Sequence, residues 1–98
     1  MELGESIFVV TTIHIKNKEI IRKRCVGWFA RFDDAFNTIK TNSGDIYEAG
    51  WYNHAIIEQI TDGLYPRIIN EYWFHWQNGG YKRTKKPVPE NWVNFGIG

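Results

Sequence analysis

The sequence has little cysteine, little proline and almost no net charge. Its one cysteine, Cys25, excludes an internal disulfide, and such sparse cysteine usage is typical of a reducing, intracellular compartment. Twelve Lys and Arg against eleven Asp and Glu leave a formal charge of +1, whereas proteins that coat DNA show a strong basic excess. We therefore expect no general DNA-binding role, although a local cluster of cations still suits one small anion.

The sequence also has no long hydrophobic run near its start. It begins Met-Glu-Leu-Gly-Glu, which is acidic rather than basic, and the apolar run Ile7–Val10 that follows is only four residues long. Such a run is too short for the core of a signal peptide or for a membrane span. We therefore expect a soluble, cytoplasmic protein without a membrane partner.

Aromatic residues, in contrast, are abundant. The 98 residues suffice for one domain, 1–98, and a chain of this length buries only about two thirds of its unfolded surface. It nevertheless carries five Trp, five Tyr and six Phe, each able to bury roughly 150–250 Å². Because a thin core does not readily hide so many rings, we expect several of them in a ligand pocket or an oligomer interface.

The first third of the chain has the pattern of a β-hairpin. Residues 6–16 and 19–29 are predicted strands, joined by a tight turn at Asn17-Lys18. In the first strand, apolar residues alternate, which predicts one buried face carrying Ile7, Val9, Ile13 and Ile15. In the second, Gly27 indicates a bulge or a close approach of another backbone.

A short helix is predicted to follow the hairpin. Asp33 or Asp34 suits its N-cap, and the helix should run to about Asn42, where Asn42-Ser43-Gly44 offers a left-handed cap. Its apolar face is expected to consist of Phe32, Ala35, Phe36 and Ile39, which are spaced three and four residues apart.

Three further strands are predicted over 50–60, 68–76 and 81–86. A turn over 61–66 separates the first two, and Asn78-Gly79-Gly80 is a strong hairpin signal before the last. The order predicts an α+β fold, an antiparallel sheet of about five strands with one short helix packed on a face. The other face should be covered by a subunit or a ligand that contacts Trp28, Trp51, Trp73 and Trp76, and the apolar C-terminal tail 90–98 should dock on the body or on a partner subunit.

Catalytic patterns are scarce. The three histidines, His14, His54 and His75, lack the spacing of a metal site, and Cys25 in a strand is interpreted as a small packed residue rather than a nucleophile. Glu48 and Glu58 have no visible acidic partner, and no Gly-rich phosphate loop occurs. We expect no enzyme activity, no metal and no cofactor.

The residue types of a nucleotide-binding site are present. A pyrophosphate needs Arg or Lys, ribose hydroxyls need polar acceptors, and a purine needs a flat ring. All three types occur near the ends of predicted strands, although rings that form the core and charges that face solvent would give the same pattern. The cations are Arg22, Arg24, Arg83, Lys85 and Lys86, the polar acceptors are Asp45, Glu48 and Asn53, and the rings are Tyr52, Trp73 and Phe95.

Short motifs along nearly the whole chain carry a family resemblance. They are Thr11-Thr12-Ile13-His14, Arg24-Cys25-Val26-Gly27-Trp28-Phe29, Phe32, Ala35, Asn42, Asp45-Ile46, Glu48, Gly50, Tyr52, Ile57-Glu58, Gly63-Leu64-Tyr65-Pro66, Trp73-Phe74, Lys86-Pro87 and Phe95-Gly96-Ile97-Gly98. In this pattern the sequence resembles the first family of phage Thoeris anti-defence proteins, the sponges that bind cyclic ADP-ribose signals.

The resemblance implies sequestration without cleavage. A protein of this family would hold the glycocyclic ADP-ribose that bacterial TIR enzymes make, in the cytoplasm of the infected host, and so block defence. It would assemble as a homodimer or as a hexamer of dimers, and some members also bind cyclic trinucleotides. Candidate contacts are Arg24 with Arg83 or Lys85 on phosphates, Tyr52 or Trp73 on adenine, and Asp45 or Thr84 on ribose. Arg22 and Lys86 are further candidate ligand-binding residues.

Two other classes of function compete with the sponge. One is a protein-interaction module that inhibits a host protein directly through exposed aromatic residues. The other is a small binder of single-stranded nucleic acid, which would use rings on a sheet with basic edges; the charge of +1 counts against it.

Overall fold

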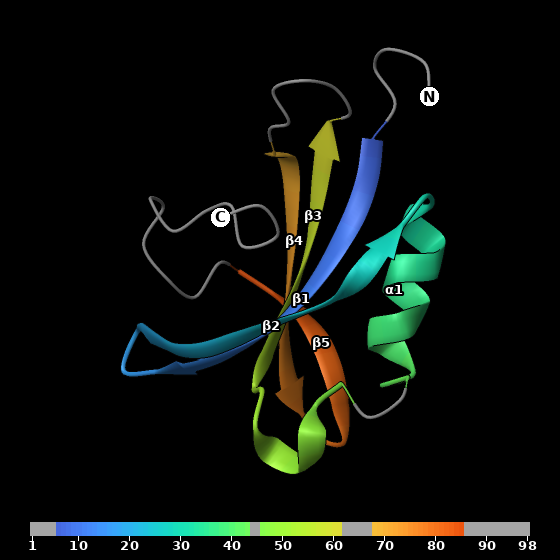
Figure 1. Ribbon diagram of the computed structural model, residues 1–98. Helices are drawn as coiled ribbons and strands as arrows, with labels where there is room; N and C mark the ends of the chain where they lie inside the picture. Colours follow the sequence, from blue (N-terminus) through green and yellow to red (C-terminus); the bar gives the residue numbers. More distant parts are fainter. Residues whose placement is uncertain (1–5, 44–45, 62–67, 86–98) are drawn as a thin grey trace.

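The protein folds into one antiparallel sheet with a helix on one face. The computed structural model describes residues 6–43, 46–61 and 68–85. The strands are β1 (Ser6–Lys16), β2 (Glu19–Phe29), β3 (His54–Thr61), β4 (Ile68–Gln77) and β5 (Gly80–Thr84), and the helices are α1 (Phe32–Lys40) and the short 3-10 helix η1 (Glu48–Gly50). The spatial order is β2-β1-β3-β4-β5, with every pair antiparallel (Figure 1). The α+β prediction is confirmed.

Two hairpin turns have the backbone shape that their sequences favour. Asn17 and Lys18 have φ of 54° and 63°, and Asn78 and Gly79 have φ of 53° and 83°. Two successive positive φ values match the twist of the flanking strands, as in type I′ turns. Both predicted turns are therefore confirmed, although Lys18 adopts a conformation that seldom suits lysine.

Strand β1 buries both of its faces, so the predicted single buried face is incomplete. Val10, which faces α1, is as fully buried as Ile13 on the opposite face. The reason is that a separate core cluster covers each face, the one that includes α1 residues on the Val10 side and the one that includes Trp73 on the Ile13 side. Alternation reveals a half-buried strand, whereas a strand covered on both faces has an almost continuous apolar pattern.

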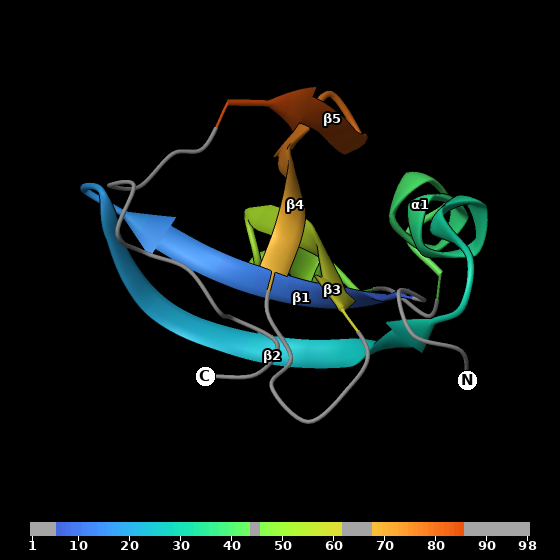
Figure 2. The ribbon, with the colours of Figure 1, turned by 90° about the horizontal axis from the view of Figure 1, so that it is seen from above.

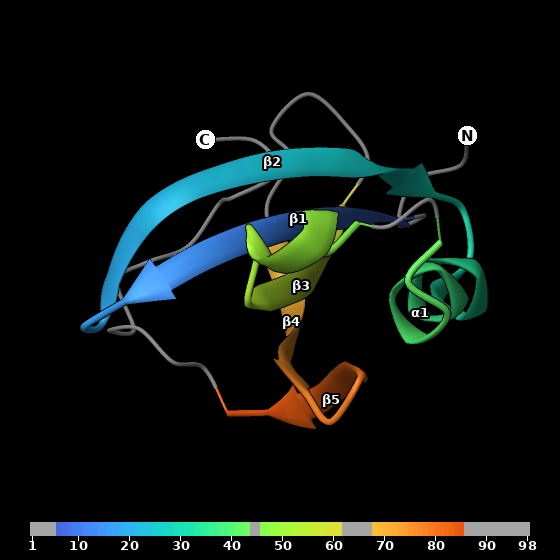
Figure 3. The same cartoon turned by 90° about the horizontal axis from the view of Figure 1, so that it is seen from below.

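The sheet is strongly bent. Seen from above and from below, β1 and β2 follow one long curve while β4 and β5 turn away from it, and α1 lies in the angle between them (Figures 2 and 3). The β1–β2 register shifts between Val10 and Thr11, which leaves Val26 as an extra residue beside Gly27. The predicted bulge is confirmed, whereas Gly27 has no heavy atom near its missing side chain, so the predicted close approach is not found.

Helix α1 packs its predicted apolar face on the sheet. Ala35 and Ile39 are buried, and Phe32 and Phe36 pack against the same core cluster. The predicted cap is wrong, because Arg31 is the N-cap residue and makes no side-chain capping bond. Asp33 and Asp34 lie in the first turn, where their negative charges interact favourably with the positive end of the helix dipole. Asn42 has φ of 49° just past the helix, as its predicted role in a left-handed cap requires.

The later elements differ from prediction mainly at their ends. The third strand starts at His54 instead of 50, because η1 and a turn occupy 48–51. The fifth strand is Gly80–Thr84 rather than 81–86. Of the turn predicted over 61–66, residue 61 is the last residue of β3, and residues 62–66 lie outside the described residues. The predicted tail 90–98 also lies outside them.

Candidate functional site

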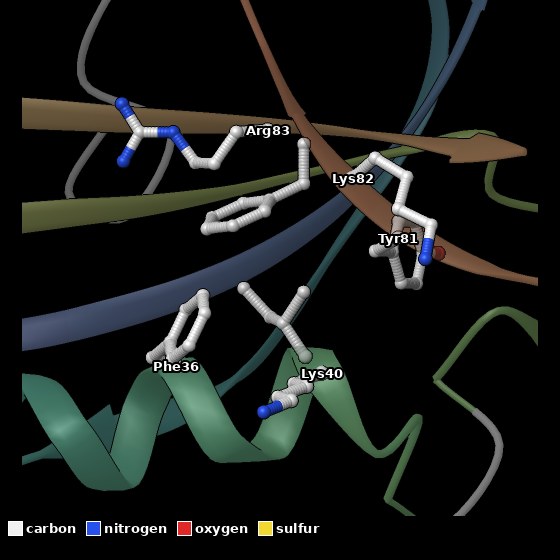
Figure 4. A pocket seen from close by; sticks show the side chains of 7 residues that line it. Phe36, Lys40, Tyr81, Lys82 and Arg83 are labelled. Atoms are coloured by element: carbon white, nitrogen blue, oxygen red, sulfur yellow. The ribbon is translucent and has the colours of Figure 1, made fainter.

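A groove opens between α1 and β5. Its volume is about 250 Å³, and its lining combines ring and aliphatic surface with cations (Figure 4). Because i, i+3 and i+4 positions share one face of a helix, α1 presents three of its residues together, while β4 and β5 supply the sheet side. The lining residues are Phe36, Ile39 and Lys40 from α1 and Phe74, Tyr81, Lys82 and Arg83 from the sheet.

The floor of the groove is continuous with the main core. Phe74 is 1% exposed, Ile39 is 1% exposed and Tyr81 is 6% exposed. The ring centroids of Phe36 and Phe74 are 6.0 Å apart, a separation typical of packed aromatic pairs. The groove therefore has a rigid apolar base on which a flat ring can lie.

Arg83 supplies the best-placed charge of the groove. Its guanidinium carbon lies 5.2 Å from the Tyr72 ring centroid and 5.6 Å from that of Phe74. Such cation–π contacts hold a guanidinium near a surface while its N–H groups stay available. Lys40 lies across the groove on α1 (Figure 4), so cationic side chains line both walls.

A buried hydrogen bond fixes the inner end of the groove. The Tyr81 hydroxyl donates to the Tyr52 carbonyl oxygen at 2.7 Å, and this hydrogen bond ties β5 to the segment that follows η1. Nearby, the Tyr47 ring stacks on Trp76 with centroids 3.7 Å apart.

A second cationic and aromatic cluster lies where β2 meets η1. The Arg22 guanidinium is 4.0 Å from the centroid of the Trp51 ring, which is 54% exposed. Arg24 forms a 2.9 Å ion pair with Glu48 and lies 5.8 Å from the Tyr52 ring centroid. None of these residues lines the groove.

The Arg24–Glu48 pair is expected to add little stability. Both side chains are more than a third exposed, and exposed ion pairs contribute about 0.2–1 kcal/mol. Arg24→Ala should therefore lower the free energy of unfolding by less than about 1 kcal/mol in urea denaturation. A larger loss would show that Arg24 also supports the fold. If the folded variant bound the ligand as tightly as the wild type, Arg24 would not belong to the binding site.

The structure distributes the predicted site residues over several places. Arg83 lines the groove, Thr84 and Lys85 follow it as exposed residues, and Arg22, Arg24 and Tyr52 form the second cluster. Trp73 lies on the opposite face of the sheet in a separate core cluster. Asp45 and Lys86 lie outside the described residues.

Two of the three predicted stacking rings, Tyr52 and Trp73, have no open face, and the third, Phe95, lies outside the described residues. Trp73 is 3% exposed and Tyr52 is 9% exposed, because each packs into the body of the protein. Trp28 and Trp51, in contrast, are 65% and 54% exposed. Cys25, interpreted as a packed residue, is exposed on β2.

Sequence reasoning missed most of the groove. It placed Phe36 and Ile39 on the apolar face of the helix and did not single out Lys40, Phe74 or Tyr81 for binding. One feature of the sequence could have pointed to the helix wall of the groove. Lys40 directly follows Ile39, and a cation beside a buried helix position is expected at the margin of the apolar face. The partner wall on β5 follows only from the tertiary fold.

The histidines, distant in sequence, meet at one end of the sheet. His54 and His75 are a cross-strand pair whose ring centroids are 4.8 Å apart. The pKa of His54 is lowered from 6.5 to about 4, mainly by burial and then by the neighbouring His75 and His14, in that order of size. The His14 Nδ1 atom is buried and has no hydrogen-bond partner in the described structure. His54 is thus held neutral at pH 7.

Asn53 links this histidine to β1. Its side-chain amide donates to the Ile15 carbonyl at 2.8 Å, and its side-chain oxygen accepts from the Ile15 N–H at 2.9 Å. The same oxygen lies 2.9 Å from His54 Nδ1. Asn53 therefore stands in for a peptide group and extends the β1–β3 ladder by one pair.

Within residues 6–43, 46–61 and 68–85, no group of three His, Cys, Asp or Glu side chains has an arrangement that could hold a metal ion. The helices in these ranges are too short and too polar to cross a membrane. Comparisons with models of protein families, with curated proteins and with solved structures found no match for this chain.

Proposed function

We propose that the protein binds a cyclic ADP-ribose type of immune signal in the groove between α1 and β5, and holds it without cleaving it. The observation that carries the proposal is the rigid apolar floor of the groove beside cations on both walls. A nucleotide complements both features, because its flat base can lie on the apolar floor and its phosphates can pair with the cations. The resemblance to phage Thoeris sponges described above favours the glycocyclic isomer made by TIR enzymes.

The size of the groove favours partial burial of such a ligand. Pockets that enclose a drug-sized molecule span about 300–1,000 Å³, whereas this groove has about 250 Å³. It fits one ring system, with the phosphates at the rim near Arg83 and Lys40. Arginine suits this place because its planar fork matches phosphate oxygens.

Under this proposal the protein acts by stoichiometric capture in the cytoplasm of the infected host. Tight binding of the signal keeps its effector inactive without any chemical step. Binding of cyclic trinucleotides, and assembly into a homodimer or a hexamer of dimers, belong to the same proposal.

Thermal-shift titration against glycocyclic ADP-ribose, linear ADP-ribose, NAD and cyclic trinucleotides tests the function. A ligand at a hundred times its Kd stabilises the folded state by about 2.7 kcal/mol, which raises the Tm of a domain of this size by roughly 10 °C or more. Recovery of the intact cyclic ligand after boiling supports a sponge. No shift with any of these nucleotides contradicts the proposal.

Removing either wall cation should weaken the ligand complex. Charge-assisted hydrogen bonds contribute about 1.5–3 kcal/mol, so Arg83→Gln and Lys40→Gln should each raise the Kd by about tenfold or more, measured by calorimetry. Lys16→Gln is the matched control, because Lys16 is an exposed cation at the far end of β1. Unchanged affinity in both groove variants would place the ligand elsewhere.

The exposed tryptophans favour one second candidate, a protein-interaction module. Trp28 and Trp51 are the type of residue that dominates binding hot spots. This candidate predicts that a host protein co-purifies with the wild type and is lost with Trp51→Ala, while no nucleotide shifts the Tm.

A further inference from the structure

The main chain of β5 borders the groove together with its side chains. Three consecutive residues of this strand, Tyr81, Lys82 and Arg83, line the groove. Successive side chains of a strand point to opposite faces of a sheet, so side chains that face α1 account for only two of the three. A run of three neighbours therefore indicates that the backbone joining them forms part of the wall.

The register of the β4–β5 hairpin shows which backbone groups point outward. β5 is the last strand of the described sheet and pairs with β4. Gln77 and Gly80 flank a two-residue turn and lie opposite each other. The hydrogen bonds that close such a hairpin join its flanking residues, and hydrogen-bonded pairs then alternate with non-hydrogen-bonded ones. Counted from the turn, Phe74 and Arg83 form a non-hydrogen-bonded pair, so the N–H and C=O of Arg83 point away from β4.

The outward carbonyl group of Arg83 places a hydrogen-bond acceptor beside the cations of the groove. Lysine and arginine side chains carry donors and no acceptor, so Lys40 and the Arg83 guanidinium suit phosphate oxygens. A backbone carbonyl oxygen instead accepts from N–H groups, and Arg83 is exposed on this edge strand. The exocyclic amino group of adenine is such a donor. A base that lies on the floor formed by Phe36 and Phe74 can direct this amino group at the β5 edge.

We infer that the carbonyl oxygen of Arg83 accepts a hydrogen bond from the exocyclic amino group of adenine and so makes the groove selective for this base. This inference rests on the proposed function and adds the base that the groove selects. The side chain of Arg83 then holds the phosphates while its main chain reads the base. Hypoxanthine carries an oxygen where adenine has the amino group, and two acceptors cannot hydrogen-bond to each other.

Three ligands that differ in the base test this inference. Glycocyclic ADP-ribose is compared by calorimetry with its counterparts in which unsubstituted purine or hypoxanthine replaces adenine. Purine lacks the donor and leaves the carbonyl oxygen unpaired, which should raise the Kd by about tenfold or more. Hypoxanthine should raise the Kd by at least the same factor, because its oxygen faces the carbonyl oxygen. Recognition of the base by the cationic side chains would give the opposite preference, since their donors suit the hypoxanthine oxygen.

The variant Arg83→Ala separates the main chain of this residue from its side chain. It removes the guanidinium and keeps the carbonyl group, so it should weaken all three ligands by about tenfold and preserve the preference for adenine. Lys16→Gln, the matched control, should change neither the affinities nor the preference.

Each outcome of these titrations decides the inference. A preference for adenine of about tenfold or more that persists in Arg83→Ala, while all affinities fall, supports it. A smaller preference, or tighter binding of the hypoxanthine form, overturns it and leaves the proposed function intact. A preference that disappears in Arg83→Ala overturns it by assigning the selection to the side chain, and affinities that Arg83→Ala does not change overturn it by placing the ligand elsewhere. No binding of the adenine form overturns the proposed function together with the inference.

Discussion

Phe74→Ala is expected to destabilise the protein by about 3–5 kcal/mol, the usual cost of emptying a buried phenylalanine site. Phe74 is 1% exposed on β4 and belongs to the core cluster between the sheet and α1. Small domains have about 5–15 kcal/mol of stability in total, so the variant should be close to unfolding at room temperature. Urea denaturation followed by circular dichroism measures the effect.

A matched substitution separates burial from side-chain size. Trp28 is larger than Phe74 but 65% exposed, so Trp28→Ala should change stability by no more than about 0.5 kcal/mol. Phe74→Leu, which keeps most of the volume, should cost less than Phe74→Ala. Similar losses in Trp28→Ala and Phe74→Ala would mean that Trp28 is covered in the folded protein, for instance by a second copy.

Acidification from pH 6.5 to pH 4 is expected to remove about 3 kcal/mol of stability through His54 alone. The unfolded chain takes up a proton on this histidine below pH 6.5, whereas the folded protein does so only near pH 4. Between these values the unfolded state binds more protons, so the free energy of unfolding falls as the pH falls. Above pH 6.5 this contribution is fully present.

His54→Gln isolates this contribution from that of the carboxylates. The variant should be less stable at pH 7, because it loses the ring contact with His75, but its stability should depend less on pH between 4.5 and 6. In this range the free energy of unfolding of the wild type should fall with decreasing pH more steeply than that of the variant. The difference in slope should approach about 1.4 kcal/mol per pH unit, which corresponds to one proton. Parallel pH profiles for wild type and variant would show that His54 titrates normally in the folded protein.

The sequence was sufficient to predict the elements whose signals are local. The turns at Asn17-Lys18 and Asn78-Gly79 were predictable because Asn and Gly adopt positive φ readily. The apolar face of α1 was predictable because its spacing follows the helical period. Errors arose where local signals compete, as at the helix start, where Asp33 suits a cap but Arg31 takes the position.

The groove was beyond such reasoning because it depends on pairing between distant strands. Arg83 was selected as a cation near a strand end, but its place opposite α1 follows from the order β2-β1-β3-β4-β5. The same order gathers His14, His54 and His75, which appeared isolated in sequence. Conversely, Trp73 and Tyr52 were selected as rings, and burial alone distinguishes a core ring from a binding surface.

The Asn53 bridge has a consequence for local opening. The last backbone pair between β1 and β3 joins Ile13 to His54, and beyond it the Ile15 N–H depends on one side chain. In a hydrogen-exchange experiment, the Ile15 amide should therefore exchange slowly despite lying past the ladder. Asn53→Ala should release this amide and fray the end of the sheet, while the amide of Val10 in the middle of β1 stays protected. The Asn53 side chain thus supplies the last hydrogen bonds between β1 and the start of β3, a role that backbone groups fill along the rest of these strands.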